Sequence, residues 1–447
     1  MLSSGLTRYP QMVFLVTSSL SKKLTGKGWA KRVQHLRWVP VMVALLACYA
    51  DITQGATRQS VFKSKPEIKA TARPVQLGDG LAEARLIEIY RLIGSANTRD
   101  ALRKAEKLVA DYPNFQLAQL VYGDLLSALS RPIQDIGDVP PEVAQNGSQN
   151  LQALRVESQL RIAAIKKRPP SDAIPSQFVA LSRRNKHAIA VDTDKARLYL
   201  FENTSTGTRL LADYYISVGK AGVGKSVEGD QRTPLGVYFV TSNLDPKSLK
   251  DLYGSGALPV NYPNVLDLRR GKTGGGIWLH GTPSNQFARA PLATDGCVAV
   301  ANPDLDRIIR TVEIQTTPVL IGKNLTWVRP SNLSSERKMF ADTLQAWAQT
   351  KKNGKEGDLL KFYARDFSAD GKDLTKFGRN LRKELANLRK RPVQLNDISL
   401  IRWSDEAEIM VATFGEIIAG EKTGRTVRQY WQRRSNVWRI IYEGAVG

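Results

Sequence analysis

The spacing of apolar residues changes along the chain, and the first folded region has helical spacing. Between residues 81 and 129 apolar positions recur every three or four residues, and Tyr112-Pro113 interrupts them. This pattern predicts a helix, a turn and a second helix, as in one tetratricopeptide-type hairpin. Residues 132–149 are interpreted as a loop, and residues 151–167 predict another amphipathic helix. We therefore expect a helical region over residues 81–170, acting as a cap or as a partner-binding module.

The next region has strand spacing. Residues 188–192 and 197–201 alternate with a period of two and predict a β-hairpin. Further strands are predicted at residues 214–218 and 237–240, with glycines frequent between them. Short strands joined by glycine-rich turns indicate a β-rich domain, which we place at residues 185–323.

The C-terminal region combines both patterns. Helices are predicted at residues 334–351, 358–367 and 374–388, and strands at residues 393–401, 408–418, 424–433 and 437–443. Residues 331–447 resemble nuclear-transport-factor-type domains, α+β cones that form a pocket or a dimer face. No cluster of acids, His or Cys is present there, so binding or structural support is expected. The predicted fold class is multidomain α+β: a helical hairpin region, a central β-rich domain and a C-terminal cone-like domain.

The N-terminal fifty residues predict export. They contain seven Lys or Arg and no acid, and basic residues precede an apolar stretch at residues 38–50 that ends in small residues. This is typical of a signal peptide. The stretch is short for a membrane span, which needs ~20 residues, but a tilted, uncleaved anchor is an alternative. Leu45-Leu46-Ala47-Cys48 also resembles a lipobox, which would make Cys48 an acylated N-terminus. Each alternative places the body in the periplasm or cell envelope, after a linker at residues 51–80.

The formal net charge of +23 is spread along the chain and is smallest in the β-rich domain. A basic surface fits either nucleic acid or an anionic envelope. Because the sequence has no nucleic-acid-binding motif, we expect no nucleic-acid partner.

The chain has two cysteines, Cys48 and Cys297. Once Cys48 is removed or lipidated, the body holds one thiol and cannot form an intrachain disulfide. An unpaired thiol in an exported protein is exposed to oxidation and mispairing. Cys297 is therefore either a chemical group or a buried cysteine that behaves as a small apolar residue.

One segment of the β-rich domain carries the candidate chemistry. Residues 276–280 predict a strand that ends in His280-Gly281, and Gly296-Cys297 opens a second apolar strand after a loop of about a dozen residues. A free thiol has a pKa near ~8.5, so Cys297 needs a neighbouring base to become a thiolate at neutral pH. Of the three histidines, His35 lies in the leader and His187 at the start of the first hairpin. His280 is therefore the candidate base.

The residues around this pair predict main-chain support. The Gly281 carbonyl can accept the imidazole N–H and fix its tautomer, and Gly296 permits a tight backbone before the nucleophile. The amides of Asp295, Gly296 and Cys297 can converge on an oxyanion, an effect of roughly 3 kcal/mol per donor. The spacing alone is also compatible with a satisfied core histidine and a buried, inert thiol.

The segment resembles the L,D-transpeptidase catalytic domain of the YkuD type. That family has His-Gly, a spacer of this length and Ser/Thr-x-Gly-Cys, as in His280-Gly281 and Thr294-Asp295-Gly296-Cys297. Residues 229–238 resemble its Thr-Pro-x-Gly-x-Tyr/Phe strand start, and Asn261-Tyr262-Pro263 matches an Asn-Tyr-Pro segment. The resemblance makes Asn261 and Tyr262 candidate substrate-binding residues. The flanking regions look like those of a proteobacterial envelope subgroup.

Two positions depart from the family pattern. Many members have His where this chain has Asp295, and a polar residue, often Arg, where it has Ala299. Asp295 is either a loop carboxylate satisfied by local amides or a residue that tunes the site for a cationic or amide-bearing substrate. A carboxylate there disfavours the thiolate. Arg289, in the loop, could bind a stem carboxylate, although a solvated loop charge is the favoured interpretation.

The resemblance implies acyl transfer on peptidoglycan stem peptides. Cys297 would attack the carbonyl between diaminopimelate and D-alanine, His280 would protonate the leaving D-alanine, and no cofactor or metal is implied. An amine of a second stem would then give a cross-link, a lipoprotein lysine would give protein attachment, and water would make the protein a carboxypeptidase or amidase. The remaining alternative is a non-catalytic envelope scaffold that binds protein partners through the helical or C-terminal region.

Overall fold

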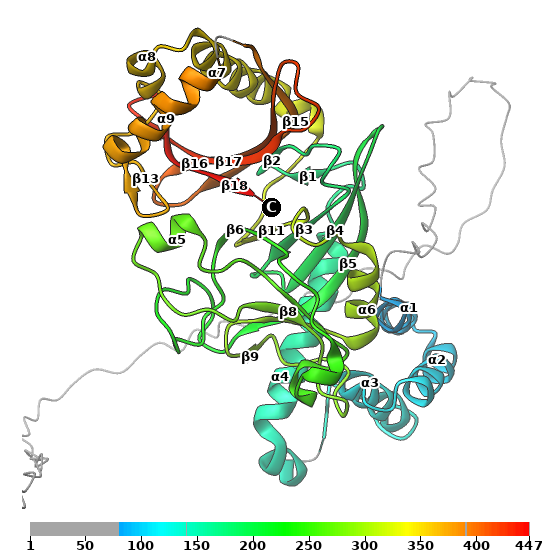
Figure 1. The fold of residues 1–447 in the computed structure, drawn as a ribbon. Coiled ribbons are helices and arrows are strands. Elements are labelled where there is room, and N and C mark those ends of the chain that lie inside the picture. Colours follow the sequence, from blue (N-terminus) through cyan, green and yellow to red (C-terminus); the bar gives the residue numbers. More distant parts are fainter. Residues whose placement is uncertain (1–79, 140, 389–390, 447) are drawn as a thin grey trace, which may run out of the picture. The chain divides into compact units, whose positions relative to one another are not determined.

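The computed structural model describes residues 80–139, 141–388 and 391–446 (Figure 1). The predicted signal peptide, anchor or lipidated Cys48 and nearly all of the predicted linker lie outside these residues. The described residues belong to one compact unit. Within them, no helix has both the length and the apolar character needed to cross a bilayer.

The helical region consists of α1 (Leu81–Gly94), α2 (Thr98–Asp111), α3 (Gln116–Ser127) and α4 (Pro141–Lys166). The prediction of one helix before Tyr112 was wrong, because Asn97 starts a second helix there: its side chain accepts a hydrogen bond from the Asp100 amide. The predicted loop at residues 132–149 is also partly helical, since α4 begins at Pro141 and continues past a kink at Gly147.

The central domain is built on a nine-stranded sheet. Its strands are β3 (His187–Asp192), β4 (Arg197–Thr204), β5 (Gly207–Gly219), β6 (Gly236–Phe239), β7 (Ala257–Pro259), β8 (Trp278–His280), β9 (Leu292–Thr294), β10 (Val298–Val300) and β11 (Pro318–Gly322). The order is β6-β11-β3-β4-β5-β10-β8-β7, with β9 beside β5. The predicted hairpin is the antiparallel β3–β4 pair. Shorter elements are η1 (Pro246–Ser248), η2 (Asp251–Tyr253), α5 (Val265–Arg269) and α6 (Asn302–Thr311).

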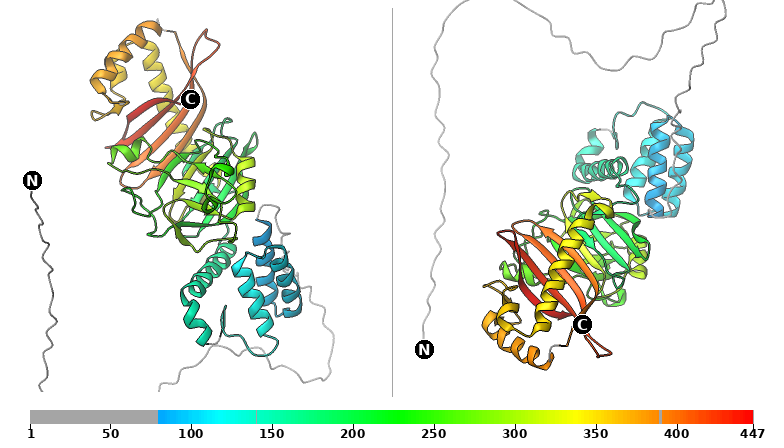
Figure 2. Two further views of the ribbon diagram at one scale, coloured as in Figure 1. Left: turned by 60° about the horizontal axis from the view of Figure 1, so that its bottom comes forward. Right: turned by 90° about the horizontal axis from the view of Figure 1, so that it is seen from above.

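The C-terminal domain has three main helices on one face of a curved antiparallel sheet (Figures 1 and 2). Its elements are η3 (Pro330–Leu333), α7 (Ser334–Asn353), α8 (Glu356–Leu360), β13 (Ser368–Ala369), β14 (Lys372–Asp373), α9 (Leu374–Leu388), β15 (Val393–Ser404), β16 (Glu408–Ile418), β17 (Arg425–Arg434) and β18 (Val437–Val446). The four long strands lie where the alternation predicted them. The helix predicted over residues 358–367 was wrong beyond Leu360, where α8 ends.

A strand from outside the C-terminal region completes this sheet. Its order is β18-β17-β16-β15-β2, and β2 (Phe178–Ala180) precedes the central domain in the chain. A second short pair, β1 (Ile174–Pro175) with β12 (Trp327–Val328), joins the two ends of the central domain. These strands of two or three residues are too short to produce a periodic pattern, so the sequence did not predict them.

A network of charged side chains lies within the otherwise apolar interior of the C-terminal domain. Lys351 is fully buried and forms ion pairs with Glu416 and with Glu384, the latter at 2.8 Å. The Tyr363 hydroxyl donates to Glu443 at 2.8 Å. Burial alone would lower the Lys351 pKa, but the surrounding carboxylates raise it. The lysine therefore stays charged inside the domain.

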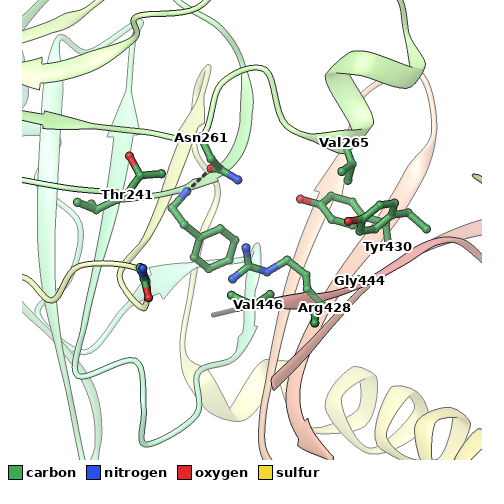
Figure 3. A pocket seen from close by; sticks show the side chains of 12 residues that line it. Thr241, Asn261, Val265, Arg428, Tyr430, Gly444 and Val446 are labelled. Carbon is green, nitrogen blue, oxygen red and sulfur yellow. Dashed lines mark hydrogen bonds between the residues drawn. The ribbon is translucent and has the colours of Figure 1, made fainter. Parts of the chain in front are cut away.

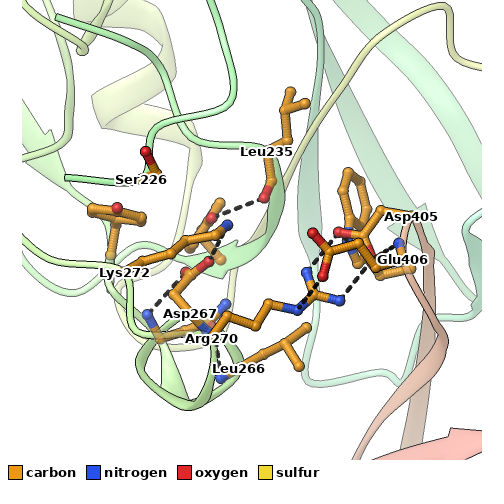
Figure 4. Close-up of polar contacts among 12 residues, drawn as sticks. Ser226, Leu235, Leu266, Asp267, Arg270, Lys272, Asp405 and Glu406 are labelled. Carbon is orange, nitrogen blue, oxygen red and sulfur yellow. Dashed lines mark hydrogen bonds and ion pairs between the residues drawn. The ribbon is translucent and has the colours of Figure 1, made fainter. Parts of the chain in front are cut away.

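Charged groups also join the central and C-terminal domains. Arg270, which follows α5, donates from both terminal nitrogens to Asp405 at 2.6 and 2.8 Å (Figure 4). The Trp403 indole N–H donates to the same carboxylate at 2.7 Å. The turn that carries Arg270 is held by a capping box between Asn264 and Asp267 at the start of α5. This bidentate pair fixes the α5 turn against the strand ends of the C-terminal sheet.

Candidate active site

His280 lies at the end of β8, and Cys297 directly precedes β10, the parallel neighbour of β8. The register places Leu279 opposite Val298 and His280 opposite Ala299. Cys297 lies in the bend just before β10, and its sulfur contacts main-chain groups of Gly276 and Trp278, at the start of the strand that ends in His280. His280 is 2% exposed, whereas Cys297 is partly exposed, so the thiol is the more accessible group of the pair.

The imidazole is held in one tautomer by the main chain. His280 Nδ1 lies 2.7 Å from the Gly281 carbonyl oxygen, which is the contact predicted from the sequence. A carbonyl only accepts hydrogen bonds, so Nδ1 carries the proton and Nε2 is left as the basic nitrogen. The Tyr253 ring packs edge-on against the imidazole, with centroids 5.2 Å apart, and fixes its plane. Sequence reasoning did not single out Tyr253.

Asn302, the first residue of α6, braces the backbone next to His280. Its Oδ1 accepts hydrogen bonds from the amides of Ser255 and Thr282, each at 3.0 Å, and its Nδ2 donates to the Thr282 carbonyl at 2.9 Å. A Cβ atom on Gly281 would overlap Asn302 Oδ1, which explains the glycine after the histidine. The sequence analysis missed Asn302, because a side chain that binds only main-chain groups leaves no spacing signal.

This brace gives a stability prediction. Asn302→Ala leaves two amides and one carbonyl without their partner, so we expect the free energy of unfolding to fall by about 2–4 kcal/mol. Asn302→Asp keeps the acceptor and should cost less. Urea denaturation measures both, with the exposed Asn332→Ala as control, since the Asn332 side chain contacts the neighbouring Ser331 hydroxyl on the surface. Equal stability of the Asn302→Ala and Asn332→Ala proteins would contradict the assigned role.

The turn before Cys297 is shaped by Thr294. Its hydroxyl donates to the Cys297 carbonyl at 2.6 Å and accepts from the Gly296 amide at 3.2 Å. Gly296 has φ +124°, and a Cβ there would lie 2.8 Å from the Arg232 carbonyl oxygen, so glycine is required. The Gly296 amide, expected as an oxyanion donor, is used inside this turn instead. The convergence of the three amides on an oxyanion stays a prediction.

The sulfur of Cys297 contacts one main-chain acceptor and one main-chain donor. Cys297 Sγ donates to the Gly276 carbonyl at 3.3 Å, and the Trp278 amide donates toward the sulfur and lowers the thiol pKa. Burial is the larger effect and raises the pKa of Cys297 to about 11, with Asp295 adding to the rise. Burial also lowers the pKa of His280 to about 4, against the opposing effect of the Gly281 carbonyl. A neutral thiol beside a neutral imidazole is therefore the resting state.

These pKa shifts predict how the reactivity of the thiol changes with pH. The thiolate fraction of Cys297 should increase steadily between about pH 6 and about pH 10, because its pKa lies above that range. We expect its alkylation by iodoacetamide, followed by intact mass and peptide mapping, to accelerate throughout this interval. A plateau near neutral pH would instead indicate a resting thiolate–imidazolium pair.

Two cationic side chains influence the pKa of the thiol. Lys225 is buried and donates to Asp230 at 2.8 Å and to the Val227 carbonyl at 3.0 Å, and its charge lowers the thiol pKa. Arg289 is half-buried, and its charge lowers the pKa values of both Cys297 and His280. Arg289 is thus only partly solvated, and its contact with a stem carboxylate stays a prediction. Lys225 was not predicted as a site residue.

Asp295 lies on the exposed side of the site. Its carboxylate pairs with Lys220 at 3.0 Å, and 68% of its side chain is exposed. Asp295 raises the thiol pKa, the direction expected from the sequence, and Arg289 and Lys225 act in the opposite direction. The cations therefore offset the carboxylate that stands where many family members have histidine.

The other two predicted substrate-binding residues, Asn261 and Tyr262, form hydrogen bonds with main-chain groups of the central domain. Asn261 accepts a hydrogen bond from the Phe239 amide at 2.7 Å and lines a cavity of about 350 Å³ together with Arg428 and Tyr430 of the C-terminal sheet (Figure 3). Tyr262 is buried, and its hydroxyl donates to a main-chain carbonyl at 3.2 Å. Contact of either side chain with a substrate stays a prediction. Among the described residues, no three His, Cys, Asp or Glu side chains are grouped to hold a metal ion.

Comparisons with known proteins identify two of the regions. Residues 186–321 match the model of the L,D-transpeptidase catalytic domain (YkuD), and residues 339–444 match the Cds6 C-terminal NTF2-like domain. The comparison with curated proteins found no match.

Solved structures are also similar to this chain. Bd1075 of Bdellovibrio bacteriovorus is 24% identical with a TM-score of 0.53, and the match covers 62% of this chain and 98% of Bd1075. The helical cell shape determining protein Pgp2 of Campylobacter jejuni is 21% identical with a TM-score of 0.47, over 64% of this chain and 99% of that chain. The resemblance predicted from the sequence is confirmed: the chain carries a catalytic domain of the L,D-transpeptidase (YkuD) family, followed by an NTF2-like domain of the Cds6 C-terminal family.

Proposed function

We propose that the protein is a cysteine-dependent L,D-transpeptidase that acts on peptidoglycan stem peptides through a thioester on Cys297. The main support is that the Cys297 sulfur contacts main-chain groups of Gly276 and Trp278, next to the strand that ends in His280. The Gly281 carbonyl supports the role of His280, because it keeps Nε2 as the free basic nitrogen. The leader predicted from residues 1–50 supports action in the periplasm or cell envelope.

In the first half-reaction Sγ of Cys297 attacks the carbonyl carbon that follows the L-centre of diaminopimelate. The thiol proton passes to His280 Nε2, and the Trp278 amide stabilises negative charge on sulfur while the S–C bond forms. The C–N bond to D-alanine then breaks, and the departing amine takes the proton from Nε2. The products are a thioester on Cys297 and free D-alanine.

In the second half-reaction an acceptor attacks the thioester carbonyl. Nε2 removes the acceptor's proton, the C–S bond breaks, and that proton returns to sulfur. An amine on a second stem gives a cross-link, and a lysine of an envelope lipoprotein gives protein attachment. Water gives hydrolysis, the carboxypeptidase or amidase alternative. The acyl donor is already an amide, so neither ATP nor a metal is needed.

The decisive experiment is an intact-mass measurement after incubation with a tetrapeptide-bearing muropeptide. We expect an added mass equal to the stem without its terminal D-alanine, located on Cys297 by peptide mapping. Mass spectra of the released products identify the acceptor and separate cross-linking from hydrolysis. No adduct and no change in the muropeptide would leave the non-catalytic scaffold as the explanation.

A further inference from the structure

The loop that connects the two candidate catalytic residues is held by the helical region. The turn between α2 and α3 contacts this connecting loop (residues 281–296) at several points. The Phe287 amide donates to the Asn114 carbonyl at 3.0 Å, and Asn114 Nδ2 donates to the Ser284 carbonyl at 3.1 Å. The Phe287 ring stacks on Phe115, with centroids 4.2 Å apart, inside the core of the helical region. The position of the loop therefore depends on the helices.

A cavity of about 220 Å³ lies between the connecting loop and the helices. On the helical side it is lined by Asn150 and Glu157 of α4, and on the loop side by Gln286, Arg289 and Ala290. The lining thus combines one cation, one anion and neutral amides. Such a cavity suits a small ligand group that carries both charges.

Arg289 connects this cavity to the reacting groups. Its guanidinium donates to the Ala293 carbonyl, and within the described residues no carboxylate lies at ion-pair distance from it. The Tyr215 hydroxyl donates to the Arg289 carbonyl at 3.0 Å and holds its backbone. Ala293 also lines the cavity and directly precedes Thr294, whose hydroxyl donates to the Cys297 carbonyl, so the cavity adjoins the candidate active site. The Arg289 charge acts on both Cys297 and His280. A guanidinium with free donors beside a cavity is suited to a ligand carboxylate.

Glu157 supplies the opposite charge. It is 3% exposed, and Arg161 donates to it twice, at 2.9 and 2.7 Å. Both bonds end on Oε1, and Oε2 accepts no hydrogen bond from the described residues. Burial raises the Glu157 pKa, and Arg161, which Glu83 also binds at 2.7 Å, offsets this only in part. A further cation in the cavity would therefore be attracted to Glu157.

We propose that α4 and the connecting loop form a subsite for the zwitterionic head group of the donor stem's side chain, with its carboxylate on Arg289 and its ammonium on Glu157. This inference rests on the proposed function. In the attacked residue, the side chain next to the reacting carbonyl ends in a carbon that carries both an ammonium and a carboxylate. The helical region then selects the donor and is part of the substrate site.

The test compares three synthetic tetrapeptide stems. The third residue is diaminopimelate with both charges, lysine with the ammonium alone, or 2-aminopimelate with the carboxylate alone. D-Alanine release gives kcat/KM, and we expect the full-length protein to prefer diaminopimelate by about tenfold or more over each analogue. Glu157→Gln should remove the preference over 2-aminopimelate and keep that over lysine. Arg289→Gln should do the reverse.

Glu83→Gln is the matched structural control. Glu83 pairs with the same Arg161 and is equally buried, but it does not line the cavity. We expect it to destabilise the protein in thermal unfolding without changing the order of donors. If Glu157→Gln slows all three donors equally, or leaves the preference intact, the subsite is refuted.

Binding to the Cys297→Ala protein, measured by calorimetry, separates this inference from the proposed function. Tighter binding of the diaminopimelate stem that Glu157→Gln abolishes supports the subsite even if no thioester forms. Thioester formation with no discrimination among the stems supports the function and overturns the subsite. Absence of binding by all three stems overturns the subsite as well.

Discussion

Cys297→Ala is expected to form no covalent adduct with a tetrapeptide stem and to release D-alanine at least ~10⁴-fold more slowly than the unaltered protein. The reason is that the sulfur provides the only bond to the acyl group in the proposed reaction. It is also placed for this role, since Cys297 is partly exposed and is held by the Gly276 carbonyl and the Trp278 amide. Intact mass reports the adduct, and a coupled D-alanine assay reports the rate.

Cys297→Ser tests the role of the sulfur as nucleophile separately from the folding of the site. A serine hydroxyl can still donate to the Gly276 carbonyl, so this variant should fold like the original protein. It should nevertheless be nearly inactive, because a hydroxyl is far harder to deprotonate than a thiol. Stem turnover that persists in Cys297→Ala would contradict cysteine catalysis, whatever the effect on stability.

His280→Gln should slow thioester formation by about 10²–10⁴-fold, the usual contribution of a general base. Glutamine can donate to the Gly281 carbonyl as the imidazole does, so the loss should come from the missing basic nitrogen. The pH dependence follows from the His280 pKa, which burial lowers to about 4. The base is neutral above that pKa, so activity should be present above about pH 4 and fall as the pH drops through it. Single-turnover kinetics at several pH values would show this acid limb.

His187→Gln is the control for this variant. His187 begins β3, and its Nδ1 lies 3.1 Å from Glu313, away from the β8–β10 pair. We expect it to keep the rate and the acid limb. Loss of the acid limb in His187→Gln, or its retention in His280→Gln, would show that His280 is not the base.

The sequence predicted those parts of the fold that short-range patterns encode. Alternating residues placed the four long C-terminal strands, and the Gly296-Cys297 motif marked the start of β10. The same patterns cannot report contacts between distant segments. Asn302 braces Ser255 across forty-seven positions, and Arg289 gains its partial burial from loop and helix packing that no local window contains. For that reason the sequence named His280, Cys297, Gly281 and Arg289 as candidates, whereas it could not name Asn302 or Lys225.

The pairing of β2 with β15 has a consequence for dissecting this protein. The chain leaves the C-terminal sheet at Ala180 and returns to the C-terminal domain at Pro330. The central domain is therefore inserted into the C-terminal domain and does not simply precede it. Deleting everything after residue 329 would leave Val179, which is inaccessible in the intact fold and packs in the C-terminal core, without cover. The exposed apolar β2 edge strand would favour self-association. A fragment that begins after Ala180 avoids that edge but loses the helices that hold the connecting loop, so the catalytic segment cannot be isolated by cutting at these two junctions alone.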